Sequence, residues 1–319
     1  VTGNFTNGAS GLIDIEIGGA TAGMTYDVLA VSGTGTMGGT LQLSEFGGWA
    51  VNASDVYTPI TCATSCTGTF LTMLPTFGDN GTATVNANDA TYTVTSAGNG
   101  ILWDGGGGNG LWQTATNWSD DALPTSTDDV VIDTGAAGGP ALITVTASSG
   151  DQQARRLVSY ENLTLSTGSL ALGSTAADTS TINGAFTLSG GTLQGSGTVT
   201  LTGASNTWSG GDMAGGGNTV IASGGSLDMS GGNRRFGGRT LTVNNGGALA
   251  WSGGAIEIGG ASTIANSGSF TISAGASMAD GSVSCCDGAG TLTLSNLAAG
   301  VITKSGASTS TIGSGITVT

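Results

Sequence analysis

The chain lacks histidine altogether and carries few charged residues of either sign. Among 319 residues there are 6 Lys plus Arg and 21 Asp plus Glu, so charged residues make up 8% of the sequence, against about 25% in a typical globular protein. Without histidine, the commonest metal ligand and the usual base of a catalytic triad are missing. Six basic residues are too few for the positive patch that nucleic acid requires, so we expect no nucleic-acid partner.

Long apolar runs are missing too, which predicts no membrane-spanning helix. Glycine, by contrast, is abundant, with 60 residues, and the net charge is −15. A hydrophobic share of 38% is enough for a core, and the low charge density argues against disorder. Glycine and β-branched residues disfavour helices, and Thr, Val, Ile and Leu alternate with polar residues as they do in strands. The sequence therefore predicts an all-β chain.

A bulky apolar residue followed by serine recurs every 20–23 residues in the C-terminal half. These positions are Leu165, Leu188, Trp208, Met229, Trp251, Ile272 and Leu294. A fixed period of this length, with short alternating strands and glycine turns, is typical of a solenoid whose stacked coils share one core. Each period holds about three apolar clusters. Residues 151–319 are therefore predicted to form a right-handed parallel β-helix with coils of about 21 residues.

Two other regions precede this repeat. Residues 99–150 break the period and contain Trp103, Trp112 and Trp118, which we expect to form a cap over the end of the solenoid core. Residues 1–98 form an N-terminal β region with alternation at 12–17 and a hairpin pattern at 82–94. This region is either a small β-sandwich or the end of another solenoid, and we favour the second.

The four cysteines form two local pairs, Cys62 with Cys66 and Cys285 with Cys286. Neither pair has the spacing of a zinc site, and no histidine can complete one. Local disulfides are the favoured interpretation, and they imply an oxidising, extracellular compartment. A bridge between Cys285 and Cys286 would join adjacent residues, a strained and rare geometry, so pairing between chains is the alternative.

Candidate sites for chemistry are sparse. Asp128, Asp129 and Asp133 belong to the densest acidic segment and would suit Ca²⁺, although solvated turn residues are the favoured interpretation. No other cofactor is expected. The only basic cluster in the repeat region, Arg234, Arg235 and Arg239, is interpreted as a solvated loop paired with Asp228. These residues form no recognisable catalytic set, so we expect the chain not to be an enzyme.

Several segments carry a resemblance to a known group. Residues 186–193, 195–201, 208–211 and 239–245 resemble the coils of large bacterial exported β-helix proteins, of the autotransporter-passenger-like and filamentous adhesin-like kind. The Trp-containing segment is similar to a unit that precedes such solenoids, and residues 26–41 are similar to the segment that closes them. In that group the closing segment usually comes last, whereas here it comes first. The departure suggests a piece of a tandem array, or a subunit whose two ends complete each other.

Both ends of the sequence have a strand-like pattern, and open strand edges pair with other chains. We therefore predict a secreted structural module that assembles head-to-tail with copies of itself at the bacterial cell surface. The alternatives are an adhesin passenger that binds a glycan or host surface and a polysaccharide-degrading β-helix enzyme. A Thr-rich face would bind ice only if it carried a regular Thr-x-Thr ladder. The residues predicted for self-assembly are Val1, Phe5, Ile13, Ile15, Ile302, Ile312, Ile316 and Val318.

Overall fold

The computed structural model describes residues 1–9, 11–45, 54–70, 72–74, 80–96, 100–132, 144–273, 275, 277–280 and 290–319. It divides into two compact units, residues 1–102 and 103–319. The Trp-rich segment and the strands that follow it therefore share one unit. The described residues form strands and one short 3₁₀ helix, η1 (Ala115–Asn117), without any α-helix. The predicted all-β class is confirmed.

Long sheets make up most of the second unit. The ten-stranded sheet contains, in order, β11 (Gly100–Leu102), β12 (Asp129–Ile132), β15 (Arg156–Ser159), β18 (Thr179–Ile182), β21 (Thr198–Leu201), β24 (Asn218–Ile221), β27 (Thr240–Val243), β30 (Ala261–Asn266), β33 (Thr291–Asn296) and β36 (Ile316–Val318). One eight-stranded sheet, here called the Trp-column sheet, contains β13 (Thr144–Ala147), β16 (Asn162–Leu165), β19 (Phe186–Leu188), β22 (Asn206–Trp208), β25 (Ser226–Met229), β28 (Ala248–Trp251), β31 (Ser269–Ile272) and β34 (Val301–Lys304). The other, here called the Arg-bearing sheet, contains β14 (Asp151–Ala154), β17 (Ser169–Leu172), β20 (Thr192–Gln194), β23 (Gly211–Ala214), β26 (Arg234–Gly237), β29 (Ile256–Gly259), β32 (Ser277–Asp280) and β35 (Thr311–Ile312).

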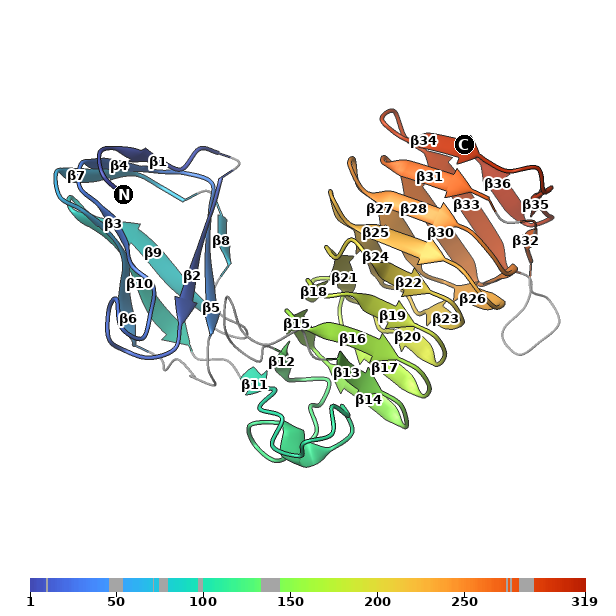
Figure 1. Cartoon of the computed structure of the whole chain (residues 1–319), viewed down its shortest axis with the longest axis horizontal. Coiled ribbons are helices and arrows are strands. Elements are labelled where there is room, and N and C mark those ends of the chain that lie inside the picture. The colour runs from blue at the N-terminus through green and yellow to red at the C-terminus, as the bar shows by residue number, and fades with distance from the viewer. Residues whose placement is uncertain are drawn as a thin grey trace. The chain divides into compact units, whose positions relative to one another are not determined.

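The chain visits these three sheets in rotation. From β12 onward, each strand pairs in parallel with the strand three places further along the chain, as β15 does with β18 and β18 with β21. Parallel neighbours joined in this way lie one above the other, and Figure 1 shows the successive layers. The long parallel sheets agree with the predicted repeat architecture.

The predicted apolar repeat positions lie in one column inside the Trp-column sheet. Leu165, Leu188, Trp208, Met229, Trp251 and Ile272 occupy matching register positions on consecutive strands, and all are buried.

The prediction was wrong for the seventh repeat position, Leu294, which does not lie in this column. Leu294 belongs to β33 of the ten-stranded sheet, opposite Ile264, and Lys304 follows Ile272 in the column. The segment between β31 and β34 is longer than in earlier coils, so counting by the period selects a residue in another sheet.

Glycine is needed where the chain turns between stacked strands. Gly168, Gly191 and Gly211 have φ values of +71°, +69° and +73°, a region that side chains with a Cβ rarely enter. A Cβ on Gly191 would also lie 2.6 Å from the Gly168 carbonyl oxygen of the neighbouring coil. Turns stacked at this distance account for part of the high glycine content.

The first unit repeats the scheme on a smaller scale. It contains β1 (Phe5–Thr6), β4 (Thr34–Met37) and β7 (Ser65–Gly68) in one sheet, β2 (Leu12–Ile17), β5 (Thr40–Glu45) and β8 (Thr72–Leu74) in a second, and β3 (Leu29–Val31), β6 (Val56–Cys62), β10 (Asp89–Ser96) and β9 (Asn80–Val85) in a third. Apart from the antiparallel pairs made by β10, the pairing is parallel. Parallel pairing fits a short solenoid rather than a sandwich of hairpins. The β9–β10 hairpin was predicted correctly.

The three tryptophans of residues 103–118 pack together at the start of the second unit. The rings of Trp103 and Trp118 lie 4.9 Å apart, and those of Trp112 and Trp118 lie 4.8 Å apart. The Trp112 amide donates to Thr146 on β13, and the Thr146 amide donates to Gly110. The Trp-rich segment therefore covers the outer edge of β13, the first strand of the Trp-column sheet.

Candidate functional site

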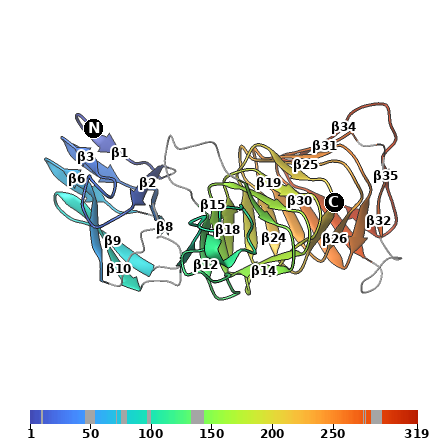
Figure 2. The ribbon, with the colours of Figure 1, turned by 60° about the horizontal axis from the view of Figure 1, so that its bottom comes forward.

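The last coil of the second unit is the clearest candidate for an interaction site. It consists of β34, β35 and β36, the final strand of each of the three sheets, and lies at the opposite end of the unit from β12 (Figure 2). Ile302, Ile312 and Ile316 stand in register with the buried residues Phe270, Met278 and Leu292 of the preceding coil. The three isoleucines thus continue the inward columns.

No described strand lies beyond these columns to cover them. Ile312 is 41% exposed and Val318 is 57% exposed, whereas the same positions one coil earlier are at most 1% exposed. Exposed apolar residues of this kind favour association, because burying them removes apolar surface from water. We call β34, β35 and β36 together the open coil.

Backbone donors also face away from the stack. The amides of Val301 and Ser305 donate to Gly268 and Ile272 of the preceding coil. Since amides along a strand point alternately to its two sides, those of Ile302 and Lys304 point to the unpaired side. An edge of this kind is a template for a further strand.

Lys304 is the only lysine in the chain, and it occupies the last position of the Trp208–Trp251 column. Its ammonium group donates to the carbonyl oxygens of Ser305 and Gly306. A charge at an inward position resists burial under another coil unless it is paired. We therefore expect Lys304 to weaken the stacking of another coil on this column. A coil with a negative charge at the facing position would be favoured over one without.

The residues predicted for self-assembly fall into three groups. Ile302, Ile312, Ile316 and Val318 come together on the open coil. Val1 and Phe5 lie at the first coil of the first unit, where the Val1 amine donates to Ala30 O at 2.6 Å and Ser32 N donates to Val1 O at 3.0 Å. Ile13 and Ile15, by contrast, are buried in the core of that unit, because they are the inward residues of an alternating strand. Their side chains are not available at a surface.

Cys62 and Cys66 form a disulfide, as the pairing by sequence predicted. Both residues are buried, and the Cys66 amide donates to Ala87 beside the β9–β10 turn. The bond therefore ties β6 and β7 together at the core of the first unit. Cys285 and Cys286 lie outside the described residues.

The acidic segment considered for calcium has other partners. Asp129 is buried and accepts hydrogen bonds from both Arg155 and Arg156, and this contact raises the pKa of Arg155. Asp128 accepts from Thr125 in a turn, and Asp133 is outside the described residues. The described residues bring together no group of three His, Cys, Asp or Glu side chains that could hold a metal. A calcium site here stays a prediction.

The interpretation of Arg234 and Arg239 as a solvated loop was wrong. Arg234 is 2% exposed and Arg239 is 1% exposed, and burial lowers the pKa of each to about 10. Arg234 donates to the carbonyls of Ser230, Gly232 and Gly253 and lies 5.8 Å from the Trp208 ring. Arg239 donates to Thr219 Oγ1 and to the carbonyls of Gly195, Ala214 and Asn218. Turns that contain glycine leave room for these guanidinium groups. The number of charged residues in a segment does not reveal that such room exists.

The sequence interpretation also missed a charge ladder on the Arg-bearing sheet. Asp212, Arg235 and Glu257 occupy matching positions on β23, β26 and β29, with ion-pair distances of 3.6 and 4.0 Å. These residues lie one coil length apart in the sequence, and a search for opposite charges at that spacing would have found them. Each side chain is partly exposed, so the ladder contributes little to stability. Burial raises the pKa of Asp212.

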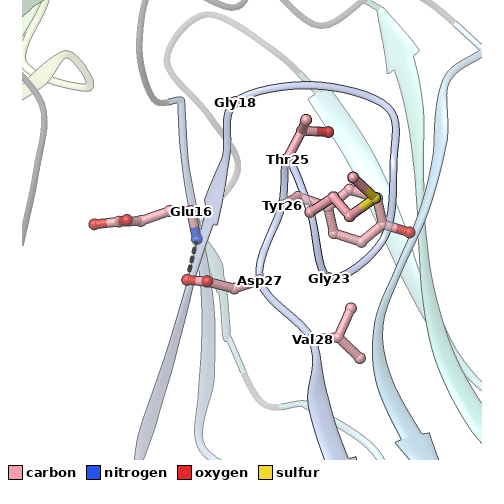
Figure 3. Close-up of a pocket in the computed structure, with 8 residues that line it drawn as sticks. Glu16, Gly18, Gly23, Thr25, Tyr26, Asp27 and Val28 are labelled. Atoms are coloured by element: carbon pink, nitrogen blue, oxygen red, sulfur yellow. Dashed lines mark hydrogen bonds between the residues drawn. The ribbon is translucent and has the colours of Figure 1, made fainter.

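A pocket of about 470 Å³ lies in the first unit, between the end of β2 and the following loop. Glu16, Asp27 and Tyr26 line it, together with the exposed Met24 (Figure 3). The Asp27 carboxylate accepts a hydrogen bond from the Glu16 amide.

Comparisons with known proteins identify no relative. No family model matches the sequence, and neither a curated protein nor a solved structure matches it. In the part of the chain that the structure describes, none of the helical residues forms a segment long and apolar enough to cross a membrane.

Proposed function

We propose that this chain is a secreted structural module of a bacterial extracellular fibre or surface matrix. In this proposal its sheets form a right-handed parallel β-helix with coils of about 21 residues, and further coils add end to end at the open coil. The observation that carries the proposal is the apolar layer of Ile302, Ile312, Ile316 and Val318, which no described strand covers and whose strand β34 points alternate amides away from its partner strand.

Two further observations support the proposal. The buried disulfide between Cys62 and Cys66 favours an oxidising compartment. At the first coil of the first unit, β1, β2 and β3 are each the terminal strand of their sheet, so a copy of the chain offers a second coil edge. Two such edges that differ from each other form a head-to-tail contact, which propagates into a filament.

The test combines electron microscopy with sedimentation velocity over a range of protein concentrations. Wild-type protein is expected to form rods that lengthen with concentration. Val318→Asp places a carboxylate in the contact and is expected to weaken association more than about tenfold, because an unpaired charge would be buried. Leu123→Asp is the matched control, since Leu123 is also exposed, at 40%, but lies outside the open coil.

A gain-of-function variant separates weak assembly from none. Lys304→Leu removes the charge from the inward column and is expected to strengthen association. Monomers at every concentration, for the wild-type protein and for Lys304→Leu alike, would contradict the proposal.

A further inference from the structure

Threonines form two parallel columns on the outer face of the ten-stranded sheet. The inward side chains of this sheet, such as Ile182, Leu201 and Val243, are buried, so the alternating residues between them face outward. From β18 to β36, the first outward column is Thr179, Thr198, Asn218, Thr240, Thr263, Thr293 and Thr317. From β18 to β33, the second is Thr181, Thr200, Val220, Thr242, Ala265 and Ser295.

The first column is almost unbroken, with Asn218 as its single exception. Three strands, β18, β21 and β27, carry threonine in both columns. The Thr-x-Thr pattern expected of an ice-binding face is thus present on three strands, and Val220, Ala265 and Ser295 interrupt its second column.

From β18 to β36 this face is uncharged, and its nearest charged residue is Arg156 on β15, which precedes Thr179 in the first column and pairs with Asp129. In the seven strands from β18 to β36, no outward position holds a charged residue. The Arg-bearing sheet carries Asp212, Arg235 and Glu257, and the Trp-column sheet carries Asp228. In a chain of net charge −15, a neutral face of this extent favours an uncharged occupant.

The outward positions of this sheet are regularly spaced in both directions. Neighbouring strands lie about 4.8 Å apart, and alternate residues along a strand lie about 6.6 Å apart. Threonine hydroxyls, each beside a methyl group, therefore repeat along the first column, and a second row accompanies them on β18, β21 and β27. Hydroxyls donate and accept hydrogen bonds with water, and methyl groups restrict the orientation of the water between them.

We propose that this threonine face binds ice. The surface of ice is uncharged and repeats in two directions, as do the outward positions of this sheet. Waters held between the threonine rows take up positions of the ice lattice and join the face to the crystal through bridging hydrogen bonds. A charged side chain would reorient these waters, and none lies among the outward residues from β18 to β36. The proposal does not depend on assembly through the open coil.

The test measures thermal hysteresis and the uptake of the protein into a slowly growing ice sphere. Wild-type protein is expected to enter the ice and to produce hysteresis. Thr240→Tyr puts a bulky ring in the middle of the first column and is expected to lower hysteresis by more than half. Thr164→Tyr is the matched control, because Thr164 is an outward threonine in a strand of the Trp-column sheet. It is expected to behave like the wild type.

Three results would overturn the proposal. The first is exclusion of wild-type protein from ice. The second is an equal loss of hysteresis in Thr240→Tyr and Thr164→Tyr. The third is absence from ice together with retention on crystalline cellulose or chitin that Thr240→Tyr abolishes, which would assign the face to a glycan. Ice uptake by the Val318→Asp variant separates this proposal from filament assembly, since that variant is expected to keep it.

Discussion

The two ends of the second unit are built from the same repeat but finish differently. At the first end, Trp112 and Trp118 are fully buried, and the segment that carries them pairs with β13. At the other end, the open coil leaves Ile312 and Val318 largely uncovered. Every coil of a solenoid presents an apolar layer to the next one. Sealing an end is therefore the work of a few particular side chains, and none of the described residues covers the open coil in this way.

The largest effect is expected from opening the sealed end. Trp118→Ala removes a fully buried ring that contacts Trp103 and Trp112, and it should lower the free energy of unfolding by about 3–5 kcal/mol. Urea unfolding of the full chain, followed by circular dichroism, measures this loss. Leu297→Ala, at an exposed position near the other end, should change stability by less than about 0.5 kcal/mol. A similar loss of stability in the two variants would contradict the claim that tryptophans seal the first end.

A smaller effect is expected in the first unit, whose sheets hold three or four strands. A short stack shares less core between coils, and the disulfide between Cys62 and Cys66 compensates for this. The double variant Cys62→Ser, Cys66→Ser should cost that unit about 2 kcal/mol, the value expected for a short closed loop. Calorimetry should show one transition shifted to lower temperature and the transition of the second unit unchanged. Two unchanged transitions would show that the bond does not stabilise the short stack.

The fold of the repeat could be predicted because a large apolar residue recurs at one register position. Leu165 through Ile272 lie in a single buried column, so their spacing reports the coil length directly. The prediction failed at Leu294, where a longer connection shifts the register between sheets. The average spacing of the repeat does not show where one connection between strands is longer than the others.

The candidate site was less predictable than the fold. Alternation marked inward positions near the end of the sequence, and the structure places Ile302, Ile312, Ile316 and Val318 together on the open coil, while their role in self-assembly stays a prediction. The same alternation selected Ile13 and Ile15, which the first unit buries. Arg234 and Arg239 were misplaced because their carbonyl partners belong to backbone turns in other coils. Every residue carries a backbone carbonyl, so the sequence does not show which carbonyls accept a hydrogen bond from an arginine.

Hydrogen exchange at individual backbone amides tests the central claim, that the open coil takes up another strand layer, most directly. The amides of Ile302 and Lys304 should exchange rapidly in dilute protein, because they point to the unpaired side. They should become protected as the concentration rises, while the Trp112 amide, already bonded to Thr146, should be protected throughout. Rapid exchange of Ile302 and Lys304 at every concentration would contradict the claim.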